Sequence, residues 1–135
     1  MENYVNDPVS YAKDVVAKDP MARFLGIEAE EVRKGYARCS VTIKPEFLNA
    51  VERAHGAIIY AVMDQAFAVA SNTTGNIAVS MNFSVNYISA AVDGEKIFAE
   101  ATPANIGNKV SVWNIVVRGR SDKIIASGTG LAYHK

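Results

Sequence analysis

The most distinctive pattern in this chain is an apolar run from Gly56 to Ser71. Between residues 56 and 70 only Asp64 and Gln65 are strongly polar, and the alanine-rich composition favours a helix. A helix that is apolar on all sides, yet too short to cross a membrane, belongs inside a protein. The pattern therefore predicts one buried helix, ended by residues 72–75, whose many alanines allow a sheet to approach closely.

Two Asp-Pro pairs mark the start of the chain. Asp7-Pro8 and Asp19-Pro20 each offer an N-cap followed by proline at the first helical position. Apolar residues recur at helical spacing after the first pair, and Gly26 can end the second segment. We expect a helical segment over about residues 8–25, made of one short helix and a further helical turn.

Alternating apolar and polar residues predict strands in the rest of the chain. Residues 37–43 alternate cleanly, and the Lys34-Gly35 turn pairs them with a weaker strand at residues 27–33. Four more strands follow the buried helix, separated by Gly-containing or Ser-Asp turns, at residues 79–87, 96–104, 110–118 and 123–133. Turns at this spacing are typical of an antiparallel meander.

The order of these elements predicts the fold class. A single apolar helix needs cover on most sides, and a strongly curved sheet wrapped around it provides that cover. The expected structure is therefore α+β, a hotdog fold in which a curved antiparallel sheet wraps one long buried helix. At 135 residues the chain fits a single domain over residues 1–135.

Composition and charge narrow the functional classes. The formal net charge is zero, with 14 basic and 14 acidic residues and no basic stripe, so we expect no nucleic-acid partner. The mixed charges between Glu28 and Lys34 are interpreted as a solvated strand edge. No metal-spaced Cys/His cluster occurs. Residues 1–7 lack the apolar core of a signal peptide, and no run can span a bilayer, so we expect a cytoplasmic protein with no membrane partner.

Asp64 is the residue with the clearest chemical meaning. An ionised carboxylate in an apolar helix is costly unless it is paired or hydrogen-bonded, and few carboxylates are fully buried. Asp64 is either a structural group that reaches a helix cap or an arginine, or a functional group. The pattern leaves both interpretations open.

His55-Gly56 marks the start of the buried helix. The first turn of a helix presents unsatisfied N–H groups and the positive end of the dipole, which can stabilise a substrate oxygen that gains negative charge. Glycine also lets a ligand approach the backbone. The alternative is an ordinary junction between loop and helix with a capping histidine.

The spacing of Gly56 and Asp64 suggests a shared site. Eight positions along a helix correspond to about 12 Å, so one small group cannot easily contact both residues within one chain. In a two-fold dimer, two antiparallel buried helices would bring Asp64 of one subunit near Gly56 of the other. Each dimer would then contain two sites, and a fully active monomer would refute this hypothesis.

Other polar residues are weaker candidates. Asn49 could hold a water or a carbonyl group, although a turn asparagine is an equal alternative. Ser80 could support the same pocket or lie exposed on a strand. Cys39 is interpreted as a core residue, and His134 is expected to fray near the C-terminus. No Gly-x-Ser-x-Gly elbow is present, which argues against a serine triad.

The residues from His55 to Asn72 resemble the helix motif of PaaI-like hotdog thioesterases. In that motif, His-Gly-Gly is followed by apolar residues, then Asp, Ala-Phe-Ala and a closing Asn. Here the sequence reads HGAIIYAVMDQAFAVASN. Asn49 and residues 79–91 are similar to the family as well, and the similarity covers most of residues 45–133. Ala57 departs from the motif, because it replaces the second glycine. This difference bears on which acyl groups the site would accept, and it leaves the backbone N–H of Gly56 in place.

The resemblance implies an acyl-CoA thioesterase for small or medium acyl groups, aromatic ones included. The protein would be a homodimer or a tetramer built from two dimers, with CoA as part of its substrate and no cofactor. Gly56 would supply the oxyanion N–H, and Asp64 from the partner subunit would act as general base or nucleophile. Asn49 would position water or the carbonyl, Ser80 would support the nucleophilic side, and His55 would orient the loop.

Two alternatives stay open at this point. A hotdog dehydratase or hydratase also acts on acyl thioesters and pairs a histidine with a carboxylate, but no Asp-x-x-x-x-His motif appears in this chain. A non-catalytic hotdog could instead bind acyl-CoA without turnover.

Overall fold

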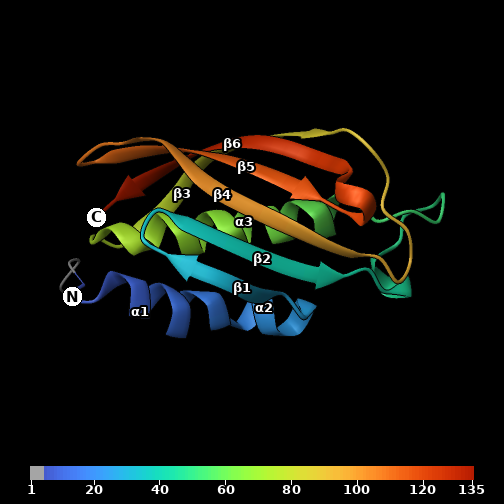
Figure 1. Cartoon of the computed structure of the whole chain (residues 1–135), viewed down its shortest axis with the longest axis horizontal. Coiled ribbons are helices and arrows are strands. Elements are labelled where there is room, and N and C mark those ends of the chain that lie inside the picture. The colour runs from blue at the N-terminus through green and yellow to red at the C-terminus, as the bar shows by residue number, and fades with distance from the viewer. Residues whose placement is uncertain (1–4) are drawn as a thin grey trace.

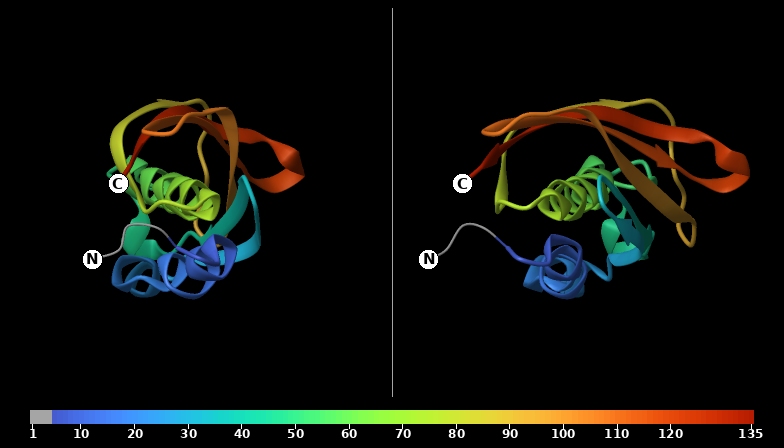
Figure 2. Two further views of the ribbon diagram at one scale, coloured as in Figure 1. Left: turned by 90° about the vertical axis from the view of Figure 1, so that its left-hand side faces the viewer. Right: turned by 60° about the vertical axis from the view of Figure 1, so that its left-hand side comes forward.

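The fold is built around one long helix, α3 (Gly56–Ser71), which begins and ends where the apolar pattern predicts. The structure is a computed structural model, and it describes residues 5–135. Figure 2 shows a curved sheet passing over one side of α3, while the N-terminal helices cover the opposite side. This is the expected α+β hotdog architecture.

Local capping explains the N-terminal helices. Helix α1 (Pro8–Asp14) begins after Asp7, whose side chain accepts a hydrogen bond from the N–H of Ser10. Helix α2 (Pro20–Leu25) begins after Asp19 in the same way and ends at Gly26, which has a φ of 75°. A 3-10 turn, η1 (Val16–Lys18), connects the two helices. Both Asp-Pro predictions are confirmed.

Six antiparallel strands form the sheet. They are β1 (Glu28–Arg33), β2 (Tyr36–Thr42), β3 (Ala78–Tyr87), β4 (Lys96–Ile106), β5 (Val110–Arg118) and β6 (Ile124–His134). Their order across the sheet is β1-β2-β4-β5-β6-β3, and Figure 1 shows the strands arching over α3. Short 3-10 turns complete the chain: η2 (Pro45–Phe47), η3 (Asn72–Thr74) and η4 (Arg120–Asp122).

The predicted meander is wrong at β3. This strand pairs with β6 rather than with β4. Residues 88–95 are too long a connection for a tight hairpin, and they lead from β3 past β6 and β5 to β4 in the interior of the sheet. Backbone hydrogen bonds from Ile43 N–H to Glu95 O and from Gly94 N–H to Ile43 O fix the end of the crossing beside β2. As a result β3 becomes an edge strand.

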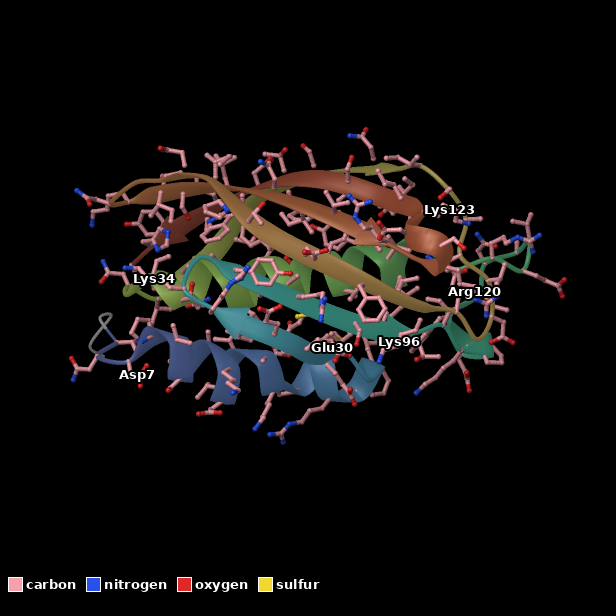
Figure 3. The ribbon with its side chains drawn as sticks, viewed as in Figure 1. Asp7, Glu30, Lys34, Lys96, Arg120 and Lys123 are labelled. Carbon is pink, nitrogen blue, oxygen red and sulfur yellow. The ribbon has the colours of Figure 1, made fainter. Side chains whose placement is uncertain are left out.

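The two edges of the sheet differ in charge. Strand β1 carries the mixed charges that the sequence assigns to a solvated edge, and Glu30 forms a 3.2 Å ion pair with Lys96 of β4 (Figure 3). Such charges discourage pairing with another chain. In contrast, β3 contains ten residues without a single charge. The β3 edge therefore lacks this common protection against strand pairing.

The core lies between the sheet and α3. Cys39 is fully buried there, as expected, and so is Trp113. His134 is the exception to the sequence prediction: it does not fray but is only 3% exposed, and its Nε2 lies 2.7 Å from Ser111 Oγ. Strand β6 continues to this residue because its end is paired with the start of β3 at Ala78.

Candidate active site

Asp64 stands where two cavities meet. The first has a volume of about 500 Å³ and lies between α2, the η2 region and the first half of α3. The second has a volume of about 410 Å³ and lies between α1, the second half of α3 and the start of β3. Asp64 lines both cavities because it occupies the middle of α3 on the side that faces the N-terminal helices.

The carboxylate of Asp64 is unpaired among the described residues. Within residues 5–135 it takes part in no hydrogen bond and no ion pair. Half-burial raises the pKa of Asp64, and the negative charge of Asp19 raises it further. A carboxylate with a raised pKa is a stronger base than an ordinary aspartate, which suits it to accept a proton from a water molecule.

A tyrosine on the same helix also responds to this charge. Tyr60 lines the first cavity one turn before Asp64. Burial raises the pKa of Tyr60, and the charges of Asp64 and Tyr87 add to the effect. Its hydroxyl therefore stays protonated and can serve as a hydrogen-bond donor.

The start of α3 carries a free backbone donor. His55 is the N-cap, and its Nδ1 accepts a 2.9 Å hydrogen bond from the N–H of Ala57. No acceptor for the N–H of Gly56 is found in the described part of the chain. The hydroxyl of Tyr87, at the end of β3, donates a 3.2 Å hydrogen bond to the carbonyl oxygen of Gly56. Gly56 is partly exposed, and its N–H is one of the unsatisfied donors at the start of a helix that a ligand can use.

The five residues proposed from the sequence fall into separate groups. His55 lines the first cavity together with Asp64, and Ser80 lines the second cavity with it. Gly56 and Asn49 line neither. The side-chain oxygen of Asn49 accepts hydrogen bonds from two backbone N–H groups of its own loop, at 3.0 and 3.1 Å. The catalytic roles of all five residues stay predictions.

Sequence reasoning missed three residues around this site. Asp19, Tyr60 and Tyr87 contact the cavities or the start of α3. Asp19 was interpreted only as a cap, because an N-cap pattern is local and does not show what the other side of the carboxylate faces. Tyr87 reaches Gly56 from 31 positions away, and no pattern along the chain indicates such a contact.

Two further findings concern metal ligands and membrane spans in the part of the chain that the structure describes. No group of three or more His, Cys, Asp or Glu side chains within residues 5–135 is arranged to hold a metal ion. No helix in the same range is long and apolar enough to span a membrane. The arrangement instead offers an unpaired carboxylate, an apolar cavity and a free amide donor.

The chain resembles thioesterases in both sequence and structure. Residues 52–126 match the family model of the Thioesterase superfamily. A relative from Archaeoglobus fulgidus, provisionally named an esterase, is 38% identical over 126 residues, which cover 93% of this chain and 82% of the relative. The acyl-coenzyme A thioesterase PaaI of Escherichia coli K12 is 26% identical over 115 residues, covering 85% and 82% of the two chains.

The solved structures agree with this similarity. The structure of the E. coli PaaI protein superposes with a TM-score of 0.87 at 24% identity, covering 94% of this chain and 96% of that one. A Streptococcus mutans protein bound to acetyl-CoA superposes with a TM-score of 0.78 at 22% identity, covering 81% and 88% of the two chains. The chain therefore belongs to the Thioesterase superfamily. The resemblance to PaaI-like hotdog thioesterases is confirmed.

Proposed function

We propose that this protein is an acyl-CoA thioesterase that hydrolyses an acyl-CoA to a free acid and CoA. The observation that carries the proposal is the unpaired, half-buried carboxylate of Asp64 beside an apolar cavity. A structural carboxylate in this position would be expected to have a partner. Membership in the Thioesterase superfamily supports the choice of a thioester as substrate.

The first cavity suits the acyl group. A volume of about 500 Å³ falls within the range of small-ligand pockets. Its wall is mainly apolar and includes Met21, Ala22, Leu25, Ile27, Phe47, Leu48, Ile58 and Ala61. Such a cavity accommodates a small or medium acyl chain or an aromatic ring, while the polar groups around Asp64 mark the end where the thioester would lie. CoA is then part of the substrate, as in the acetyl-CoA complex of the S. mutans protein, and we propose no further cofactor.

Each proposed site is shared between two subunits. The two halves of the site lie at opposite ends of β3: Ser80, near its start, lines a cavity with Asp64, whereas Tyr87, at its end, contacts Gly56. If the uncharged β3 edge pairs antiparallel with the same edge of a second copy, the start of one strand lies opposite the end of the other. Asp64 of one subunit then approaches Gly56 of its partner. This arrangement supports a homodimer with two sites, which could assemble further into a tetramer.

The chemistry follows from these groups. Asp64 accepts a proton from a water molecule, whose oxygen attacks the thioester carbonyl carbon. The carbonyl oxygen becomes negatively charged and is stabilised by the N–H of Gly56 of the partner subunit. The C–S bond then breaks, and the CoA sulfur leaves as a thiolate that takes up a proton. The raised pKa of Asp64 suits a general base, and direct attack by the carboxylate on the thioester carbon is the alternative route for the same residue.

Thiol release from a panel of acyl-CoA esters tests the function. Wild-type protein should release CoA, and both Asp64→Asn and Asp64→Ala should lose most of that activity while they keep the fold. Crotonyl-CoA hydration is measured in parallel, because water addition without thiol release would identify a hydratase instead. Tight binding of CoA esters without turnover would identify a non-catalytic protein. Unchanged hydrolysis by both Asp64 variants would refute the mechanism.

Proline at Gly56 tests the amide donor with a matched control. Gly56 is the first residue of α3, a position where proline is tolerated, and Gly56→Pro removes the N–H that the mechanism needs while adding a Cβ beside the Tyr87 ring. Loss of one oxyanion donor typically lowers turnover about 100- to 1,000-fold. Gly56→Ala is the control: its Cβ would meet the same Tyr87 ring, at 3.3 Å, but the N–H remains. Equal losses in both variants would attribute the effect to the Tyr87 contact.

Mixing the two inactive variants tests the shared site. If Asp64→Ala and Gly56→Pro subunits exchange at random, about half of the dimers are mixed, and each mixed dimer contains one intact site. Activity should therefore return to about a quarter of the wild-type value. No recovery in a mixture that is shown to have exchanged subunits, or full activity in a monomer, would contradict a site shared across β3.

A further inference from the structure

A second carboxylate, that of Asp19, lines the same two cavities as Asp64. Of the described residues that line the two cavities, only Asp19 and Asp64 line both. They belong to different elements, since Asp64 is in the middle of α3 and Asp19 precedes α2. Two like charges at one junction of cavities are unfavourable when both groups are ionised, so their arrangement requires a functional or structural reason.

Asp19 is held in place by its own helix. One oxygen of its carboxylate accepts a 2.9 Å hydrogen bond from the N–H of Ala22 at the first turn of α2. Such a bond fixes the orientation of the carboxylate at the start of the helix. No ion pair to Asp19 is found within residues 5–135. Its negative charge is therefore fixed in position and is not neutralised by a neighbouring cation.

The remaining groups around Asp64 do not replace this charge. The titratable side chains that share a cavity with it are Tyr60 on α3 itself, His55 before α3, Glu46 in η2, Tyr11 on α1 and Asp19. No lysine or arginine of the described chain lines either cavity. Glu46 and His55 line only the first cavity, and Tyr11 lines only the second. Among the described residues, Asp19 is the only other carboxylate that lines both of the cavities that Asp64 lines.

We propose that Asp19 is a positioning residue for catalysis, whose fixed negative charge at the junction of the two cavities controls the protonation of Asp64. This inference rests on the proposed function, in which Asp64 is the general base. The two carboxylates have different environments, one hydrogen-bonded to a helix N-terminus and one unpaired beside apolar walls. Different environments of this kind allow two neighbouring carboxylates to have different roles in one site.

The direction of the effect follows from the charge. Burial and the charge of Asp19 both raise the pKa of Asp64. Removing the charge of Asp19 should lower that pKa, so the acid limb of the kcat/KM profile for thiol release should move to lower pH. The variant would then gain activity relative to wild type on the acid limb. On the neutral plateau it would keep or lose activity, because a weaker base transfers protons less effectively.

Asp19→Asn and Asp19→Ser test this proposal without removing the helix cap. Asparagine and serine are N-caps of similar strength to aspartate, so both variants lose the charge and keep the hydrogen bond to Ala22. Asp7→Asn is the matched control. Asp7 precedes a proline and caps α1 with a 3.2 Å bond to Ser10, and it lies at the N-terminal end of α1 (Figure 3), but it lines neither cavity.

Two readouts separate this proposal from the proposed function. The first is the pH profile of thiol release, in which both Asp19 variants should shift and Asp7→Asn should not. The second is direct titration of the Asp64 carboxyl carbon by NMR, which needs no turnover. An Asp64 titration that is identical in wild type and both Asp19 variants, or that moves as far in Asp7→Asn, would overturn the role of Asp19. If the wild type releases no thiol, the proposed function fails, and the titration still decides whether Asp19 controls Asp64.

Discussion

Gly130 of β6 lies against the ring of Phe67 on α3, and adding a methyl group there should destabilise the protein. A Cβ at this residue would overlap the Phe67 ring, with Cζ at 2.7 Å and two other ring atoms nearer still. Phe67 is fully buried and cannot swing into solvent. In the sheet, Gly130 lies between Trp113 of β5 and Phe83 of β3. Gly130→Ala therefore adds volume where no space is available.

The expected magnitude follows from the packing of this contact. Overpacking of a core typically costs about 1–3 kcal/mol, and the overlap with a ring that cannot move places Gly130→Ala in the upper part of that range. Phe67→Ala alone should cost about 3–5 kcal/mol, because it leaves a cavity. In the double variant the new methyl group occupies part of that cavity, and alanine is preferred over glycine within a strand by about 0.5–1 kcal/mol. The two changes should therefore couple by about 2 kcal/mol or more.

Urea unfolding measured by tryptophan fluorescence provides the assay. Trp113 is the only tryptophan of the chain and is fully buried directly opposite Gly130. The four proteins of the double-mutant cycle are compared at one fixed protein concentration, since association changes apparent stability. Gly94→Ala is the control. Gly94 has a φ of 82°, and a Cβ added there would meet no atom within 4 Å. Gly94→Ala therefore introduces backbone strain alone, and its cost in unfolding free energy should add to that of Phe67→Ala without coupling. A change below about 0.5 kcal/mol for Gly130→Ala, or additive costs in the cycle, would refute the close approach.

Two further predictions concern α3 and its end. Folding raises the pKa of Asp64, so the ionised form of this residue is less favourable in the folded state than in the unfolded state. The free energy of unfolding therefore decreases as the pH rises from the unfolded-state pKa through the higher folded-state pKa. Asp64→Asn should therefore raise the Tm at pH 7, and the difference from wild type should shrink towards zero in acid; an equal or lower Tm at pH 7 would contradict this. Asn72 links the end of α3 to β3 through three buried or partly buried hydrogen bonds to Ala68 and Ala78. Asn72→Ala should therefore lower the free energy of unfolding in urea by about 1–3 kcal/mol. A change near zero would show that these bonds are dispensable.

Those parts of the fold that depend on neighbouring residues could be predicted from the sequence. The Asp7 and Asp19 caps and Gly26 define the N-terminal helices through contacts within a few positions. The apolar run similarly defines α3. Hydrophobic alternation placed each strand to within a few residues. All of these features are set by local geometry, which a pattern along the chain records directly.

The parts that depend on distant contacts could not be predicted. The Asp93-Gly94 turn looks like a hairpin turn, yet β3 and β4 lie at different positions in the sheet. The partner of a strand is decided by the whole sheet rather than by its nearest turn. The same reason explains His134, whose burial depends on Ser111 and on the end of β3. At the site, sequence analysis found Asp64 but could not reveal that Asp19 shares both of its cavities.

The unexpected position of β3 has the largest consequence for function. Helix α3 is rigid and separates Gly56 from Asp64 by about 12 Å, so no change within one chain can bring the donor to the carboxylate. A simple meander would have placed β3 inside the sheet, paired on both sides, and neither of its ends could have met a second copy. The crossing of residues 88–95 leaves β3 at an edge without charges. Ser80 and Tyr87 connect the two ends of this edge to the Asp64 cavity and to Gly56. Because β3 is separated from β4 in the sheet, its outer edge stays free. Antiparallel pairing of this edge with a second copy could then complete the proposed site.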